Sequence, residues 1–107
     1  MKLSEKKCVA CEGGTPPLNL KQVNEFMKEL SGWELDAGHL VKYFQFKDFK
    51  ETMKFVNKVA DLSEEEGHHP DLFVSYGKLK IELWTHAVGG LSENDFILAA
   101  KIDALNR

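Results

Sequence analysis

The sequence predicts a single α+β domain whose helices and strands follow the order α-β-β-α-β-β-α. Two stretches of β-type residues are each interrupted by a turn of glycine and polar residues, which is typical of β-hairpins. Three other stretches repeat apolar residues every three or four positions, as amphipathic helices do. A chain of 107 residues is long enough for one hydrophobic core and too short for two.

Composition narrows the class of protein. With 43% hydrophobic and 29% charged residues, the chain matches an ordinary soluble globular protein. It has no apolar run near the roughly eighteen residues of a membrane-spanning helix and no apolar signal core, so we expect a cytoplasmic protein that does not bind membranes. The formal net charge of -3 lacks the basic excess that nucleic-acid binding requires.

Residues 1–18 are predicted to form an irregular N-terminal lead-in, because this segment contains Gly13-Gly14 and two adjacent prolines. Cys8 and Cys11 form a single C-x-x-C pair. A structural zinc site needs four ligands, and a redox C-x-x-C begins a helix after a strand; the sequence offers neither context. We therefore favour cysteines without a metal or redox role, with a local disulfide or a metal shared between chains as alternatives.

The first helix is predicted to begin at a cap by Asn19 and to end at Ser31-Gly32. A hairpin follows, with strands over 33–35 and 40–46 and its turn at 36–38. Alternation gives the longer strand two distinct faces. The apolar stripe of the helix consists of Leu20, Val23, Met27 and Leu30. One face of the longer strand carries Leu40, Lys42, Phe44 and Phe46.

The second helix is predicted from about Asp48 to Glu66. One apolar stripe is enough to cover a small sheet, and this helix carries more. We interpret the surplus as a contact between subunits, with an aromatic side chain covered by a loop as the alternative. The stripe expected to face the core is Phe49, Met53, Val56 and Ala60. The surplus consists of Phe55, Val59 and Leu62.

A second hairpin is predicted over 72–76 and 80–86, with its turn at Gly77-Lys78. The segment 92–95 is typical of a helix start and opens the last helix. In the later strand, Ile81 and Leu83 are expected to face the core. The opposite face would carry Lys80, Glu82, Trp84 and His86. The apolar residues of the last helix are Phe96, Ile97, Ala100 and Ala104.

Three of the four histidines lie where they could form a site. His68 and His69 stand together before a proline at the end of the second helix, and His86 closes a strand. Each residue also has a structural explanation on its own. His68 and His69 could belong to a solvated loop, and His86 could cap the end of a strand. Asp95 could complement the positive end of a helix dipole, and Glu64 could belong to a solvated acidic run. Together they indicate a general acid/base cluster, because imidazole titrates nearest to neutral pH.

With these residues the sequence resembles the pterin-4a-carbinolamine dehydratase family over nearly its whole length. The segment 7–18 also resembles the N-terminus of bacterial and plant members. The motifs that carry the resemblance are Gly32-Trp33, Phe46-Lys47-Asp48-Phe49, Glu64-x-x-x-His68-His69-Pro70, Thr85-His86 and Gly90-Leu91-Ser92-x-x-Asp95.

The resemblance implies a four-stranded antiparallel sheet with helices packed on one face, assembled as a homodimer or homotetramer. It also implies a lyase that uses no cofactor and no metal. Its substrate would be a 4a-hydroxytetrahydropterin, which an aromatic amino acid hydroxylase produces. The products would be quinonoid dihydropterin and water, as in tetrahydrobiopterin recycling.

The resemblance also implies roles for individual residues. The catalytic residues would be His68, His69 and His86. Asp95 would orient or tune a histidine, and Glu64 would support the site. At Gly67, Leu72 and Asn94 the sequence departs from the animal form of the family. These differences would affect the walls of the pocket, so the identity of the natural pterin is not determined. The residues expected to bind substrate are His68, His69, Pro70, Thr85, His86, Ala87 and Val88.

Three other functions are considered. A metallohydrolase could use the three histidines and Asp95 as ligands, but adjacent histidines rarely converge on one ion and the helical H-x-x-x-H spacing is absent. A protein-interaction or assembly module of the same fold, with little dehydratase activity, could use the surface formed by Phe55, Val59 and Leu62. A family member could also serve another pterin pathway.

Overall fold

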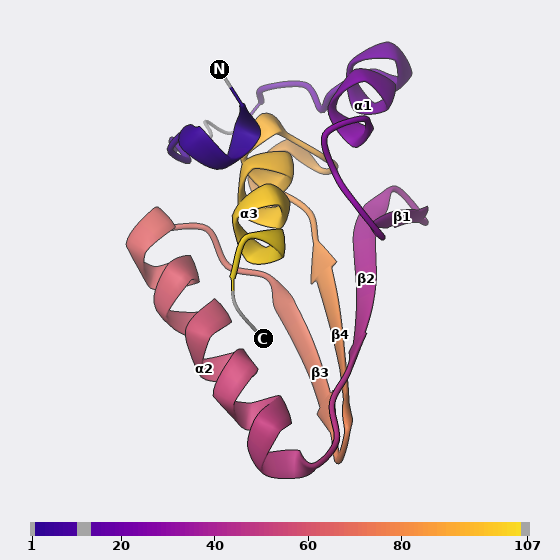
Figure 1. Ribbon diagram of the computed structural model, residues 1–107. Helices are drawn as coiled ribbons and strands as arrows, with labels where there is room; N and C mark the ends of the chain where they lie inside the picture. Colours follow the sequence, from indigo (N-terminus) through magenta and orange to yellow (C-terminus); the bar gives the residue numbers. More distant parts are fainter. Residues whose placement is uncertain (1, 11–13, 106–107) are drawn as a thin grey trace.

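The computed structural model describes residues 2–10 and 14–105 (Figure 1). Its helices and strands follow the predicted order α-β-β-α-β-β-α, and two short 3-10 turns are added at Leu3–Glu5 and His86–Val88. In the described ranges, no helix is long and apolar enough to cross a membrane. The elements are α1 (Leu20–Met27), β1 (Glu34–Asp36), β2 (His39–Gln45), α2 (Phe49–Glu66), β3 (Asp71–Ser75), β4 (Lys78–Leu83) and α3 (Glu93–Asp103).

The four strands form one antiparallel sheet in the order β1-β2-β4-β3, and α2 and α3 cover the same face of it (Figure 1). The prediction of a four-stranded antiparallel sheet with helices on one face is confirmed. Ala37 and Gly38 both have positive φ, as a two-residue type I′ turn requires. The second turn lies at Tyr76 and Gly77, one residue earlier than predicted. A Cβ at Gly77 would lie 2.8 Å from the backbone oxygen of Phe46, which explains the glycine.

Several predicted boundaries differ from the structure. α1 ends at Met27, and Leu20 at its start is exposed although it was expected in the apolar stripe. β4 ends at Leu83, so His86 begins a 3-10 turn and is not part of the strand. The chain leaves the ladder there and turns toward α3, which places His86 at the end of the sheet.

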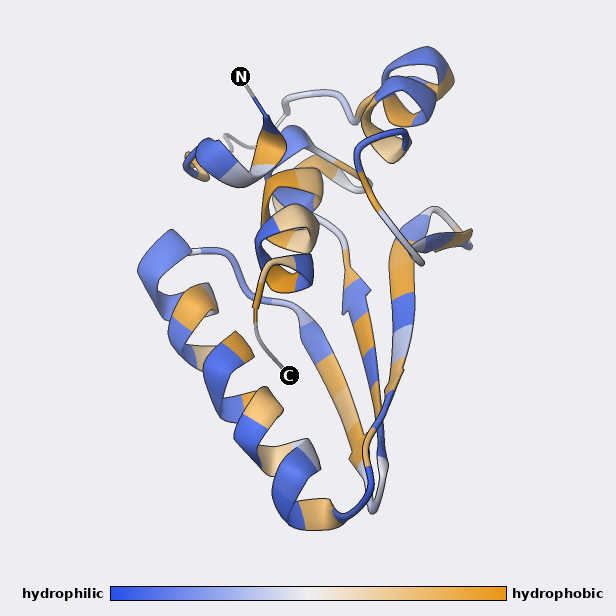
Figure 2. Cartoon of the chain, in the orientation of Figure 1, coloured by the Kyte–Doolittle hydropathy of each residue, from blue (hydrophilic) through white to orange (hydrophobic). Residues whose placement is uncertain are grey.

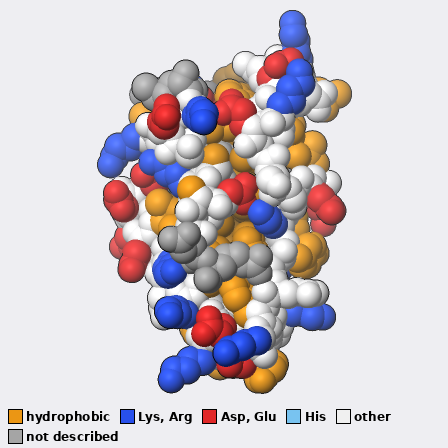
Figure 3. All heavy atoms as spheres, in the orientation of Figure 1, with side chains coloured by type: hydrophobic (Ala, Val, Ile, Leu, Met, Phe, Trp, Pro, Cys, Tyr) orange, Lys and Arg blue, Asp and Glu red, His pale blue; other side chains and the backbone are white. Residues whose placement is uncertain are grey.

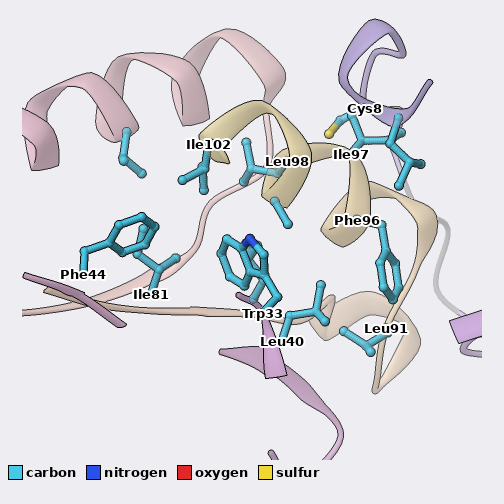
Figure 4. Close-up of a cluster of buried hydrophobic side chains, with 14 of the residues drawn as sticks. Cys8, Trp33, Leu40, Phe44, Ile81, Leu91, Phe96, Ile97, Leu98 and Ile102 are labelled. Atoms are coloured by element: carbon cyan, nitrogen blue, oxygen red, sulfur yellow. The ribbon is translucent and has the colours of Figure 1, made fainter. Parts of the chain in front are cut away.

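The core fills the space between the sheet and the two helices that cover it. Figure 2 shows hydrophobic and hydrophilic residues alternating along β4, whose buried residues Leu79, Ile81 and Leu83 face the helices. Lys42 lies on the same face of the sheet, and its charge is paired there: its Nζ is 2.7 Å from Oδ1 of Asp103, which also accepts a hydrogen bond from the Trp33 indole. The residues labelled in Figure 4 are Cys8, Trp33, Leu40, Phe44, Ile81, Leu91, Phe96, Ile97, Leu98 and Ile102.

The prediction of which face of α2 meets the core was wrong. Phe55 and Val59, interpreted as a subunit contact, are buried in the core, and Leu62 packs against it. Of the stripe expected in the core, Phe49 is 49% exposed and Ala60 is exposed, and Val56 packs against the core from its edge. The buried face also carries polar residues, which hid it from a search for apolar periodicity. Those buried polar residues are Thr52, Ser63 and Glu66.

The N-terminal segment is irregular as predicted apart from a 3-10 turn at Leu3–Glu5, and its described residues also pack against the rest of the fold. Leu3 is buried in its 3-10 turn, and Cys8 reaches the core. Oε1 of Glu66 accepts a hydrogen bond from the Cys8 N–H at 2.9 Å, and Oε2 accepts one from Lys101 at 2.8 Å. Burial, reinforced by the neighbouring Glu66 charge, raises the pKa of Cys8 to about 12, so the thiol stays protonated. Cys11, the other member of the C-x-x-C pair, lies outside the described residues.

Phe55→Ala should lower the free energy of unfolding by about 3–5 kcal/mol, because it removes a buried aromatic ring from the core. Phe49→Ala is the matched control on the same helix and should cost about 0.5 kcal/mol or less, because half of that ring is exposed. Urea unfolding of both variants measures the difference. A larger loss for Phe49→Ala than for Phe55→Ala would contradict the observed orientation of α2.

Glu66→Gln should destabilise the fold at pH 7 by about 1–3 kcal/mol, because it weakens the contacts to Cys8 and Lys101. Burial acts to raise the pKa of Glu66, but those two contacts outweigh it and hold the pKa below its ordinary value. A depressed carboxyl pKa stabilises the fold above the ordinary value of about 4.3 and ceases to do so as the pH falls below it.

The test is urea unfolding from pH 7 to pH 3, with the exposed neighbour Glu65→Gln as control. The stability difference between wild type and Glu66→Gln should shrink as the pH falls below about 4.3. A difference that stays constant over this range would show that the charge of Glu66 contributes nothing.

Candidate active site

The carboxylate of Asp95 is fully buried in the first turn of α3 and joins three parts of the chain. Its Oδ2 accepts hydrogen bonds from the Thr85 hydroxyl at 2.8 Å and from the Ser92 N–H at 3.0 Å. Its Oδ1 lies 2.6 Å from Nε2 of His68. Asp95 therefore fixes the end of the sheet, the start of α3 and the exit from α2 relative to one another.

This contact sets the orientation of the His68 ring. An ionised carboxylate only accepts hydrogen bonds, so Nε2 of His68 is protonated and donates the hydrogen bond to Asp95. In the neutral ring, Nδ1 is then free to accept a proton. Only 12% of the His68 side chain is exposed, so the ring is held between protein and solvent. An aspartate that fixes the tautomer of a histidine is a recurring arrangement in proton-transfer sites.

The local backbone explains how His68 reaches Asp95. α2 ends at Gly67, whose φ of 68° is left-handed, and the N–H groups of Gly67 and His68 both bond to the Ser63 carbonyl. A glycine adopts this conformation without steric cost. The departure at Gly67 therefore has a structural consequence here, because it ends the helix and turns the next residue toward α3.

His69 and Glu64 form a separate pair. His69 Nε2 lies 2.5 Å from Glu64 Oε2, and the two side chains are 62% and 78% exposed. An exposed pair of this kind contributes little to stability, so its value would lie in orienting the imidazole. The following Pro70 is half-buried.

His86 stands at the same end of the sheet, next to Thr85. Thr85 pairs with Gly90 across the loop between β4 and α3, and the 3-10 turn between them carries the exposed His86 and Ala87 and the buried Val88. The imidazole of His86 packs on the Trp84 ring, with their centroids 3.7 Å apart. The structure thus joins His68, Thr85 and Asp95 directly, with His86 adjoining them through the chain.

The sequence interpretation missed some residues at this end of the molecule. Ser92 was read as a helix start and as part of a family motif but not as a site residue, yet its hydroxyl lies 2.7 Å from that of Thr85, which itself donates to Asp95. His39, the fourth histidine, stacks on Trp84 from β2. Alternation did place Trp84 on the correct face of the sheet, but sequence distance gave no sign that His39 lies beside it.

Two further features of the described residues are the distribution of surface charge and the arrangement of possible metal ligands. On the face shown in Figure 3, positive and negative side chains are intermixed and form no patch of one sign among the described residues. Within residues 2–10 and 14–105, no three His, Cys, Asp or Glu side chains are grouped so that they could hold a metal ion.

Comparison with known proteins adds independent information. The family model described as "Pterin 4 alpha carbinolamine dehydratase" matches residues 16–105. A protein of Rickettsia bellii, provisionally named pterin-4-alpha-carbinolamine dehydratase, is 51% identical over 105 residues, covering 96% of this chain and 93% of the relative. A protein of Nitrosomonas eutropha with the same provisional name is 49% identical over 104 residues, covering 96% and 92%.

Two solved structures share the fold. A protein from Brucella melitensis described as a transcriptional coactivator/pterin dehydratase has a TM-score of 0.78 and 31% identity, covering 82% of this chain and 96% of that one. A pterin dehydratase-like protein described as a RuBisCO assembly factor in the alpha-carboxysome has a TM-score of 0.59 and 30% identity, covering 69% and 88%. The matched family model and these relatives show that the chain belongs to the pterin 4 alpha carbinolamine dehydratase family.

Proposed function

We propose that this protein is a hydro-lyase that dehydrates a 4a-hydroxytetrahydropterin to a quinonoid dihydropterin and water. Membership of the family supports the reaction class. The observation that carries the proposal is the His68–Asp95 hydrogen bond, because it orients a largely buried imidazole beside the loop that holds His86. In the proposed pathway, an aromatic amino acid hydroxylase supplies the substrate.

The reaction calls for two proton transfers and no redox step. The C4a–O bond breaks with its electron pair, and the departing hydroxyl takes a proton and leaves as water. The N5–H gives its proton to a base, and its electrons form the new C4a=N5 double bond. One protonated and one neutral imidazole can perform both transfers near neutral pH.

The histidines fit these tasks as a group. His68 has its Nε2 proton engaged by Asp95, which leaves Nδ1 to exchange a proton with the pterin. Glu64 supports His69 in the same manner at the surface, and His86 approaches from the loop after β4. We assign acid and base roles to the trio collectively. The pterin would lie against His68, His69, Pro70, Thr85, His86, Ala87 and Val88.

Replacing His68, His69 or His86 singly with alanine should slow enzymatic dehydration about 100-fold or more, which is the usual contribution of a positioned acid or base. The measurement follows decay of 4a-hydroxytetrahydropterin generated in place by a hydroxylase, with the spontaneous rate subtracted. Chelator-treated wild type should keep its full rate. Asp61→Asn, an exposed change on α2, is the control and should behave as wild type.

If chelator-treated wild type decays the substrate no faster than buffer does, the dehydratase proposal fails for that pterin. An assembly or protein-interaction role would then be favoured, because two structural relatives are described as a coactivator and an assembly factor.

We also propose that the flank of α2 joins copies of this chain into a homodimer or homotetramer. Phe49 is among the large exposed hydrophobic residues, and Met53 follows it one turn later and is partly exposed; Val56, which packs against the core, borders this strip on its inner side. An apolar strip of this kind on a surface helix commonly marks a contact between proteins. The buried Phe55 and Val59 are unavailable for that contact.

Met53→Asp should therefore lower the mass found by sedimentation equilibrium while the circular dichroism of the fold is kept, because it places a charge in the apolar strip. Glu65→Gln also changes one charge, on an exposed side of α2 away from this strip, and should leave the mass unchanged. An unchanged mass for Met53→Asp at every protein concentration would exclude this flank as the interface.

A further inference from the structure

We infer that Trp84 and His39 hold the imidazole of His86 in one orientation at the site. The inference concerns a part of the sheet face that α2 and α3 leave uncovered. It rests on the proposed function to the extent that His86 takes part in proton transfer. The orientation itself can be measured without any activity.

The strand register brings His39 and Trp84 together. Leu40 of β2 pairs with Leu83 of β4, so the next position along the ladder sets His39 opposite Trp84. Both side chains point away from the helices, because their neighbours Leu40 and Leu83 are buried in the core. The two rings stack with centroids 4.6 Å apart and planes inclined by only 8°. A cross-strand pair of stacked rings restricts both side chains.

Trp84, restricted in this way, contacts the ring of His86. Their ring centroids lie 3.7 Å apart with planes inclined by 36°, which is direct contact. Within the described residues, no hydrogen bond to the His86 imidazole is present, and His86 itself is exposed. Packing against the indole is thus the contact that limits its rotamers.

His39 is itself fixed from the side. Its Nδ1 lies 2.5 Å from Oε2 of Glu82, the β4 residue diagonal to it on the same sheet face. Glu82 also approaches Lys80, with its Oε1 3.5 Å from Nζ. The hydrogen bond from His39 lowers the pKa of Glu82, so the carboxylate is ionised at neutral pH. It accepts a hydrogen bond from the Nδ1–H group, which sets the plane of the His39 ring. The stack therefore starts from a hydrogen-bonded histidine and ends at the candidate catalytic one.

Orientation matters for proton transfer, since a displacement of about 1 Å can cost about 100-fold in rate. An exposed histidine without this support would sample several rotamers. Trp84 and His39 are thus positioning residues for His86. Neither needs to contact the pterin for this role.

The experiment combines histidine NMR of the full chain with steady-state kinetics. In wild type, the ring current of Trp84 should displace the His86 Cε1–H resonance, which His86→Ala identifies. Trp84→Ala should remove that displacement, and Trp84→Phe should keep part of it because an aromatic face remains. His39→Ala should reduce it by freeing Trp84, and His39→Phe should restore it by replacing the stacked ring.

The kinetic arm separates positioning from binding. Trp84→Ala should lower kcat about 10- to 100-fold with little change in KM, and Trp84→Phe should recover most of kcat. A His86 resonance that does not move in folded Trp84→Ala or His39→Ala overturns the inference, as does an unchanged kcat in both variants when His86→Ala is impaired.

The two proposals fail in different ways. If His86→Ala keeps the wild-type rate, the catalytic role of His86 is lost, and the NMR displacement alone then decides whether Trp84 and His39 orient the ring. If Trp84→Ala does not fold, as judged by circular dichroism, His39→Ala and His39→Phe carry the same comparison, because they change the stack one residue further from His86.

Discussion

The buried carboxylate of Asp95 is the contact on which the arrangement of this molecule depends. It accepts hydrogen bonds from the end of the sheet at Thr85, from the start of α3 at Ser92 and from His68 beyond α2. A charge without exposure to water is stable only when its oxygens are fully hydrogen-bonded, so these partners are held together by the cost of leaving Asp95 unpaired. The same requirement that closes the fold at this end also orients the imidazole. Structure and chemistry are therefore served by one residue.

Most of the fold could be predicted from the sequence, because each helix and hairpin has a local signal. The turn at Ala37 and Gly38 and the cap at Asn19 depend only on neighbouring residues. The orientation of α2 could not be predicted, because its buried face includes Ser63 and Glu66, whose polar atoms find partners elsewhere in the chain or one turn back along the helix. Apolar periodicity scores such residues as exposed. The packing of the irregular N-terminal segment also could not be predicted, since the side chain that binds the Cys8 N–H lies 58 residues away in the sequence.

The site shows a similar division. Spacing and resemblance indicated His68, His69, His86 and Asp95 as candidates, and the structure adds how they are grouped: His68 with Asp95, His69 with Glu64, and His86 with Trp84. The first two groupings depend on the left-handed turn at the end of α2, and the contact of Trp84 with its other neighbour depends on the register of β2 against β4; no local pattern reveals the partners. His39 is the clearest example, because only the register places it beside Trp84. Local patterns in the sequence thus indicated which residues belong to the site, and long-range contacts determine how those side chains are arranged.

Asp95 sets the tautomer of His68 in this arrangement, and long-range nitrogen–proton NMR on protein labelled at histidine tests this most directly. At a pH where the imidazole is neutral, we expect His68 to carry its proton on Nε2, with the shift of a hydrogen-bonded group, and we expect a folded Asp95→Asn variant to lose that preference. A neutral His68 protonated on Nδ1, or a tautomer that Asp95→Asn leaves unchanged, would contradict the account. In that case the buried carboxylate would only close the fold, and the orientation of the candidate catalytic histidine would need another origin.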